Sequence, residues 1–150
     1  IKNAGADAVL VVDAPHELKE ENILRENLNK NELSLIKLVA PTTDEQRLKD
    51  IIKISSGFLY QVTVTGTTGQ KSADESTVKN FIDKIKAISN IPVCTGFGIK
   101  TPADAKKMAN TGPSGVIVGS AFVKYIQDNL GDKNLPQNLG KLISSFVKEL

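Results

Sequence analysis

Two glycine-containing turns hold the residues of this chain that are best suited to chemistry. The first turn contains Gly96 and Gly98, and the second contains Gly119 and Ser120; each follows a short apolar run and precedes a helical pattern. A turn that opens a helix directs backbone N–H groups and the positive end of the helix dipole at one point, which suits a phosphate. Each glycine alone could equally serve a tight turn. Two such turns at adjacent strand ends favour a phosphate site.

The elements that must position these turns alternate along the chain. We expect strands at residues 8–12, 33–39, 58–62, 91–94 and 115–118, because these runs are apolar and are bounded by turn residues. A helical pattern follows each strand, and a last amphipathic helix carries apolar residues from 139 to 150. Strands that alternate with helices form parallel sheets with right-handed crossovers. The sequence therefore predicts an α/β fold whose strand-to-helix loops meet at one edge of the sheet.

Local signals predict where helices begin and end. We expect Thr43 to cap a helix that Gly57 ends, Thr101 to cap a second helix, and Gly131 to stop a third. Residues 63–76 form a long connection rich in Thr, Gly, Ser and Asp, and such a connection is a candidate lid. The clearest apolar stripe in the chain consists of Val78, Phe81, Ile82 and Ile85.

Composition restricts the class of protein. The chain has 150 residues, 40% of them hydrophobic, and a net charge of +2 with acidic and basic residues interspersed. This balance gives no reason to expect a nucleic-acid or membrane surface, and we expect a cytoplasmic protein. The single cysteine excludes an internal disulfide and a multi-cysteine zinc site. We expect residues 1–150 to form a single domain, and the absence of an initial methionine to mark a piece of a longer protein.

Four segments together resemble a known family. They read DAVLVVDAP at residues 7–15, Tyr60 followed by TGTTG at 65–69, GFGI at 96–99 and VGSA at 118–121. In this order and spacing the chain resembles the alpha subunit of tryptophan synthase over its whole length. The resemblance implies a TIM (β/α)8 barrel, of which this chain would supply the last five strands, and therefore an incomplete barrel. It also implies a lyase of tryptophan biosynthesis that cleaves indole-3-glycerol phosphate by retro-aldol chemistry.

The resemblance also implies roles for individual residues. The substrate phosphate would be bound by Gly69, Gly98, Gly119 and Ser120. The substrate pocket would be lined by Tyr60, Leu10, Phe97 and Ile99, with Leu10 and Phe97 against the indole ring. Gly66 and Thr68 would belong to the lid, and residues 13–15 would lie near a contact with the beta subunit. Neither a metal nor an organic cofactor is implied.

The reaction needs two carboxylates to move protons, and the resemblance implies that both lie upstream of this chain. We therefore expect no catalytic residue in residues 1–150 and little turnover by this chain alone. Two alternatives stay open: another phosphate-binding barrel enzyme, such as a ribulose-phosphate epimerase or a thiamin-phosphate synthase, and a non-catalytic half-barrel that binds a phosphate or a partner. The single histidine, His16, cannot supply the paired histidines of an epimerase metal site.

Several other polar residues have simpler interpretations. We interpret His16 as a solvated surface residue and Cys94 as a packing residue within a strand. Asp13, at a strand end, suits either a catalytic or an interface role. Asp74 and Glu75 are interpreted as surface charges of the lid rather than as substrate ligands.

Overall fold

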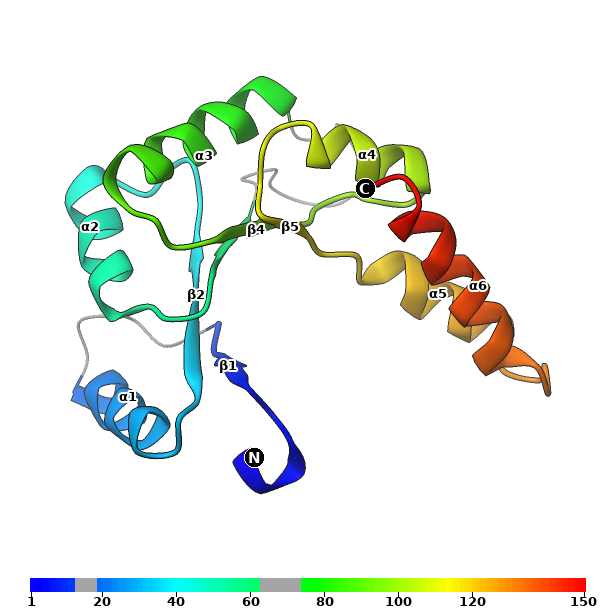
Figure 1. The fold of residues 1–150 in the computed structure, drawn as a ribbon, viewed down its shortest axis with the longest axis horizontal. Coiled ribbons are helices and arrows are strands. Elements are labelled where there is room, and N and C mark those ends of the chain that lie inside the picture. Colours follow the sequence, from blue (N-terminus) through cyan, green and yellow to red (C-terminus); the bar gives the residue numbers. More distant parts are fainter. Residues whose placement is uncertain (13–18, 63–73) are drawn as a thin grey trace.

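Five parallel strands form one sheet in the computed structural model, which describes residues 1–12, 19–62 and 74–150. The strands follow one another across the sheet in chain order, as Figure 1 shows. Their bounds are β1 Ala8–Leu10, β2 Ser34–Val39, β3 Leu59–Gln61, β4 Val93–Thr95 and β5 Gly115–Val116. The predicted number and direction of the strands are confirmed. Most strands are shorter than the apolar runs that predicted them, because the ends of the runs enter the loops.

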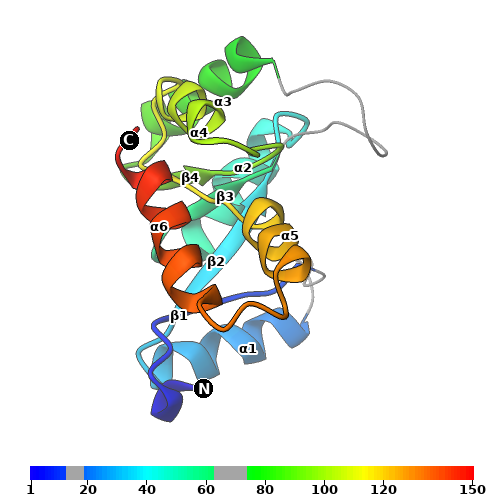
Figure 2. The same cartoon turned by 90° about the vertical axis from the view of Figure 1, so that its right-hand side faces the viewer.

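The helices follow the strands as the alternation predicts. A short 3-10 helix, Lys2–Ala4, precedes β1, and the α-helices are α1 Lys19–Lys30, α2 Glu45–Ile54, α3 Glu75–Ile88, α4 Pro102–Ala109, α5 Ser120–Asp128 and α6 Leu135–Val147. Helices α1 to α4 lie along the outer side of the curved sheet, whereas α5 and α6 lie side by side and extend beyond β5 (Figures 1 and 2). No helix within the described residues is long and apolar enough to cross a membrane.

The face of the sheet that points toward the helices is closely packed. Strand register places Val39 beside Gln61, and Gln61 beside Thr95, on this face. Leu59 and Val93, also on this face, are fully buried against apolar side chains of α2 and α3. The stripe predicted for α3 is confirmed, because Val78, Phe81, Ile82 and Ile85 are all buried.

The opposite face of the sheet is less covered. Leu38, Tyr60 and Cys94 are register partners on this face and are only partly buried. Leu10, at the end of β1, is 38% exposed. The difference between the faces is the one expected for part of a barrel, in which this face would point to the interior.

The apolar core is divided into two clusters that β2 connects. The larger cluster lies under α2, α3 and α4 and includes Val39, whereas the smaller one lies under α1 and includes Leu35. Lys37 lies between these two residues on the same face of β2 and forms a buried ion pair with Glu21 of α1. A charged pair thus separates the two apolar clusters.

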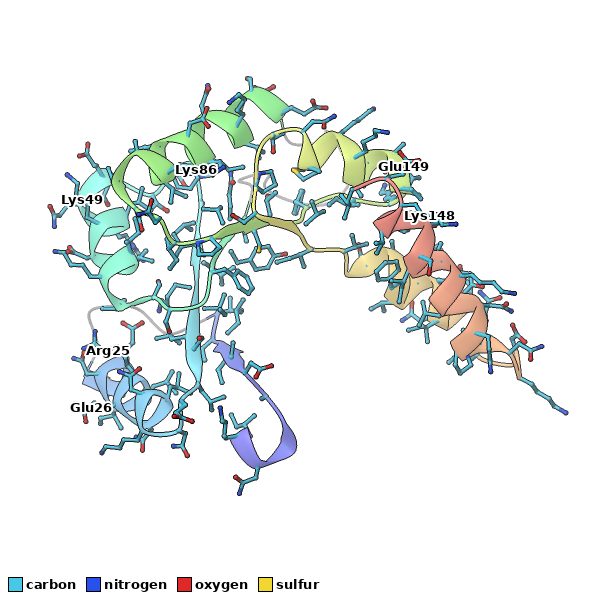
Figure 3. The ribbon with its side chains drawn as sticks, in the orientation of Figure 1. Arg25, Glu26, Lys49, Lys86, Lys148 and Glu149 are labelled. Atoms are coloured by element: carbon cyan, nitrogen blue, oxygen red, sulfur yellow. The ribbon has the colours of Figure 1, made fainter. Side chains whose placement is uncertain are left out.

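Other charged side chains hold the outer surface together. Lys86, near the end of α3, donates a hydrogen bond of 2.6 Å to the carbonyl of Gly112, and Glu149 pairs with Lys106 of α4 at 2.9 Å. Figure 3 shows Lys86 on α3 and Glu149 at the C-terminal end beside α4. These contacts connect the loop of Gly112 to α3 and the C-terminal end of the chain to α4.

The helix boundaries confirm some local predictions and correct others. Thr101 and Asp104 form the two reciprocal bonds of a capping box, as the sequence predicts for α4. Helix α2 is capped by Asp44 rather than by Thr43, because the Asp44 carboxylate accepts a 2.9 Å bond from the N–H of Arg47. The hydroxyl of Thr43 instead accepts a bond from the N–H of Ala40 in the preceding turn.

The glycine stops predicted for α2 and α5 lie beyond the observed helix ends. Helix α2 ends at Ile54 with Ser55 as its C-cap, and Gly57 adopts the predicted left-handed conformation, with a φ of +80°, in the turn before β3. A side chain there would also press against Ile36. Helix α5 ends at Asp128, and the side-chain amide of its C-cap residue, Asn129, donates to the carbonyl of Tyr125. Asn129, and not Gly131, therefore satisfies a carbonyl at the carboxyl end of α5.

The last helix matches the prediction in part. Phe146 is buried and packs edge to face on Phe122 of α5, with ring centroids 5.1 Å apart. Ile143 remains partly exposed, and Leu150 lies beyond the end of the helix and is largely exposed. The apolar stripe of α6 is therefore only half covered by the described residues.

Candidate phosphate site

The loops that leave β4 and β5 touch one another at the carboxyl edge of the sheet. Gly96 lies so close to the backbone of Ile117 that a Cβ at position 96 would lie 2.0 Å from the Ile117 carbonyl oxygen. Only glycine fits there, so this residue serves the approach of the two loops. Because the loops touch, the residues that follow them can act on the same ligand.

Tyr60 of β3 supports the first of these loops. Its hydroxyl donates a 3.0 Å hydrogen bond to the carbonyl of Gly96. Burial raises the pKa of Tyr60, so the phenol remains a neutral hydrogen-bond donor at ordinary pH. The side chain that the sequence assigned to the pocket wall therefore also fixes the position of the glycine loop.

Gly98 is required for its backbone conformation rather than for space. Its φ is +66°, and nothing lies within 4 Å of the position that a Cβ would take. Positive φ favours glycine, and the open surroundings leave room for a ligand beside the backbone.

The amino end of α4 is already occupied by the protein itself. One carboxylate oxygen of Asp104 accepts hydrogen bonds from the N–H of Lys100 at 3.1 Å, the N–H of Thr101 at 2.9 Å and the Thr101 hydroxyl at 2.8 Å. The hydrogen bond from the Thr101 side chain is the main reason that the pKa of Asp104 is lowered. A second anion would find these donors taken.

The amino end of α5, in contrast, carries no side-chain cap. Gly119 is the N-cap residue, and its carbonyl accepts bonds from the N–H groups of Phe122 and Val123. The first N–H groups of a helix have no partner within the helix, so those of Ser120 and Ala121 point out of the amino end. Gly119 and Ser120 are both exposed. Of the two neighbouring helix ends, α5 is the one that can accept an anion.

The remaining predicted site residues fall into three groups. Leu10 and Phe97 are 38% and 42% exposed at the carboxyl ends of β1 and β4. Ile99 is 4% exposed and belongs to the main apolar cluster, where it anchors the glycine loop to the core. Gly66, Thr68 and Gly69 lie outside the described residues, as do Asp13 and His16 and the whole of residues 13–15.

Two hollows lie at the carboxyl edge of the sheet. One, of about 140 Å³, lies beside the glycine loop and is lined by Glu75, Phe97, Gly98, Ile99, Asp104, Lys107 and Met108. The other, of about 280 Å³, lies at the end of β2 and includes Thr42, Thr43, Asp44 and Arg47 in its lining. The sequence did not indicate Lys107 or Arg47. Their only signal was a cation three residues after an acidic residue, the N-cap Asp44 in α2 and the capping-box Asp104 in α4.

Cys94 and Asp74 contribute to packing and to helix capping, respectively. The sulfur of Cys94 would lie 3.0 Å from a Cβ at Gly115, so thiol and glycine fit each other across β4 and β5, and burial raises the pKa of the thiol. Asp74 caps α3 through bonds from Ser76 and Thr77, which adds a structural role to its predicted surface position. Within the described residues no group of three or more His, Cys, Asp or Glu could hold a metal ion.

The parallel sheet, with helices along one face and glycine turns gathered at its carboxyl edge, is typical of part of a (β/α) barrel protein. A sequence profile described as tryptophan synthase alpha chain matches residues 1–147. The chain belongs to the tryptophan synthase alpha chain family.

Individual relatives agree with this assignment. The chain is 44% identical over 132 residues to the tryptophan synthase alpha chain of Desulfatibacillum aliphaticivorans, a match that covers 88% of this chain and 49% of the relative. The crystal structure of tryptophan synthase subunit alpha from Legionella pneumophila str. Paris superposes with a TM-score of 0.82 at 33% identity, covering 99% of this chain and 53% of that one.

A chain of the tryptophan synthase complex from Pyrococcus furiosus superposes with a TM-score of 0.77 at 28% identity, covering 98% of this chain and 56% of that one. The chain thus spans about half the length of the relatives it matches.

Proposed function

We propose that this chain supplies the phosphate-binding side of the active site of a tryptophan synthase alpha chain. In this proposal the substrate is indole-3-glycerol phosphate, and its phosphate lies at the amino end of α5. The uncapped end of α5, which follows the loop that touches Gly96, is the observation that carries the proposal. Family membership supports the choice of substrate. Gly98, Gly119 and Ser120 are the ligands among the described residues, and Gly69 is the proposed ligand outside them.

The proposed role of these residues in the reaction is to hold the substrate in one orientation. Cleavage breaks the bond between C3 of the indole ring and the glycerol carbon, while the glycerol hydroxyl loses its proton and becomes the aldehyde of glyceraldehyde 3-phosphate. C3 gains a proton and indole leaves. A phosphate fixed far from the breaking bond supplies binding energy that orients the reacting carbon. Tyr60, Leu10 and Phe97 form the proposed wall around the indole ring.

The proton transfers need an acid and a base, and we place both outside residues 1–150. Among the described acidic residues near the site, Asp104 is held in the capping box of α4 and Asp74 caps α3. Glu75 lines the hollow beside Gly98 but is exposed at the start of α3, and we interpret it as a surface charge. The proposal therefore gives this chain phosphate binding without turnover. A beta subunit is the proposed partner of the whole protein, with residues 13–15 near the contact.

A second candidate is a half-barrel that binds a phosphate or a partner without chemistry. The partly exposed face that bears Leu38, Tyr60 and Cys94 favours it, because such a face can pack against another polypeptide. This candidate shares the phosphate site with the first one and differs only in turnover by the full-length protein.

Calorimetric titration tests the site, and an indole assay tests the chemistry. Glycerol 3-phosphate should bind to the chain, whereas glycerol at the same concentration should not, because only the ester presents an anion to α5. Indole-3-glycerol phosphate should release indole with the full-length protein and not with residues 1–150. Equal binding of glycerol and glycerol 3-phosphate would contradict the phosphate site. Release of indole by residues 1–150 would contradict the placement of the acid and the base.

A further inference from the structure

The loop that carries Gly98 is held at three points, and the only exposed residues between them are Phe97 and Gly98. On one side, the carbonyl of Gly96 accepts the hydrogen bond from Tyr60. In the middle, the side chain of Ile99 is buried in the core. On the other side, the N–H of Lys100 donates to Asp104. The position of the Gly98 backbone is therefore set by its neighbours.

Asp104 accepts one hydrogen bond, from the N–H of Lys100, that does not belong to the capping box of α4. The capping box of α4 uses the reciprocal bonds between Thr101 and Asp104. The bond from the Lys100 N–H lies before the helix and on the same carboxylate oxygen. Asp104 thus joins the helix to the last residues of the glycine loop.

From this geometry we infer that Asp104 is a positioning residue for the phosphate site: it acts through Lys100 on the backbone of Gly98. The inference rests on the proposed function, because it assumes that Gly98 contacts the substrate phosphate. Asp104 does not itself touch the phosphate. The amino end of α4 is capped by Thr101, whose hydroxyl accepts the bond from the Asp104 N–H, so the anion is left to Gly98 and to the uncapped end of α5.

Without Asp104 the loop samples more conformations, and the ligand must order it on binding. The stabilisation that a helix cap usually contributes corresponds to about a fivefold change in an equilibrium constant, which sets the upper limit of the effect on the dissociation constant. The Asp104→Ala variant should therefore bind glycerol 3-phosphate about fivefold more weakly. Asp104→Asn keeps an oxygen acceptor and should restore most of the affinity.

Asp44→Ala is the matched control. Asp44 caps α2 through the N–H of Arg47 and makes no contact with the glycine loop. Both alanine variants lose a cap and both should unfold at a lower temperature. Only Asp104→Ala should weaken binding, and only Asp104→Ala should speed hydrogen exchange at the Lys100 amide, by about tenfold or more.

The experiment compares these variants in the protein at its natural full length, by calorimetry with glycerol 3-phosphate and by hydrogen exchange read at single amides. An unchanged affinity in Asp104→Ala, or an equal loss in Asp44→Ala, would overturn the positioning role while leaving the phosphate site intact. Failure of the unmodified protein to bind glycerol 3-phosphate would overturn the proposed function and the positioning role together.

Discussion

Replacing Gly119 with aspartate should abolish phosphate binding without harming the fold. Gly119 has a φ of −116°, which other residues adopt, and nothing lies within 4 Å of the position its Cβ would take. Aspartate is among the best N-cap residues, because its carboxylate accepts bonds from the first N–H groups of a helix once ψ at position 119 turns from −72° to the extended region that a side-chain cap uses. The new side chain would therefore occupy the donors that we assign to the phosphate.

Gly119→Asp should weaken phosphate binding but stabilise the folded protein. Two charge-assisted hydrogen bonds from α5 to a phosphate are each worth about 1.5 to 3 kcal/mol. Losing them weakens binding by about 100-fold or more, and repulsion between two anions adds to the loss. The cap itself stabilises the folded state by about 1 kcal/mol, which raises the midpoint of thermal unfolding by about 2 to 4 °C for a chain of this size.

Calorimetric titration with glycerol 3-phosphate, together with thermal unfolding, measures both effects. The matched control is Gly131→Asp, which adds the same charge just beyond the other end of α5, again with nothing within 4 Å of the new Cβ. The control should bind within about twofold of the unmodified protein, since it removes no donor. If Gly119→Asp bound as tightly as the unmodified protein, or if Gly131→Asp lost as much affinity, the assignment of α5 as the anion site would be refuted.

Three further predictions concern stability. Gly96→Ala should lower the free energy of unfolding in urea by about 3 kcal/mol or more, because its Cβ would collide with the Ile117 carbonyl; a loss under 1 kcal/mol would show that the loops move apart easily. Gln61→Leu should raise that free energy by about 1 kcal/mol, because Gln61 is fully buried and its Oε1 has no hydrogen-bond partner among the described residues; a decrease would mean that this oxygen is satisfied in solution. The hydrogen bonds that lower the pKa of Asp104 stabilise the fold above the ordinary carboxyl pKa of about 3.9, and this contribution disappears as pH falls through the lowered native pKa. The free energies of unfolding of Asp104→Asn and the unmodified protein should thus differ at pH 6, by less than about 1 kcal/mol because the carboxyl is close to solvent, and should converge as the pH falls below the lowered native pKa. A difference that stays constant from pH 6 into this acid range would contradict the assigned hydrogen bonds.

The parts of the fold that sequence predicted well depend on neighbours along the chain. The stripe of α3 repeats within two turns, and the capping box of α4 joins residues three apart, so both are visible in the order of residues. Parallel strand order follows from the alternation of strands and helices. None of these features requires knowledge of distant contacts.

The features that the sequence did not predict depend on choices between adjacent residues or on distant contacts. Thr43 and Asp44 can both cap α2, and only the backbone path decides that Asp44 does so. Phe97 and Ile99 are both apolar, yet one is exposed and the other is buried. The contrast between the filled end of α4 and the open end of α5 depends on where the Asp104 carboxylate points. The sequence shows that a carboxylate is present at position 104, but not which N–H groups donate to it.

The ion pair between Lys37 and Glu21 has a consequence for how the chain unfolds. It separates the small cluster under α1 from the large one under α2 to α4, so few apolar contacts connect them except along β2. Units that share little apolar contact open independently. The segment of β1 and α1 should therefore come apart first, while β3 and β4 remain folded under α3. The boundary between the two cooperative units therefore lies within β2, at Lys37.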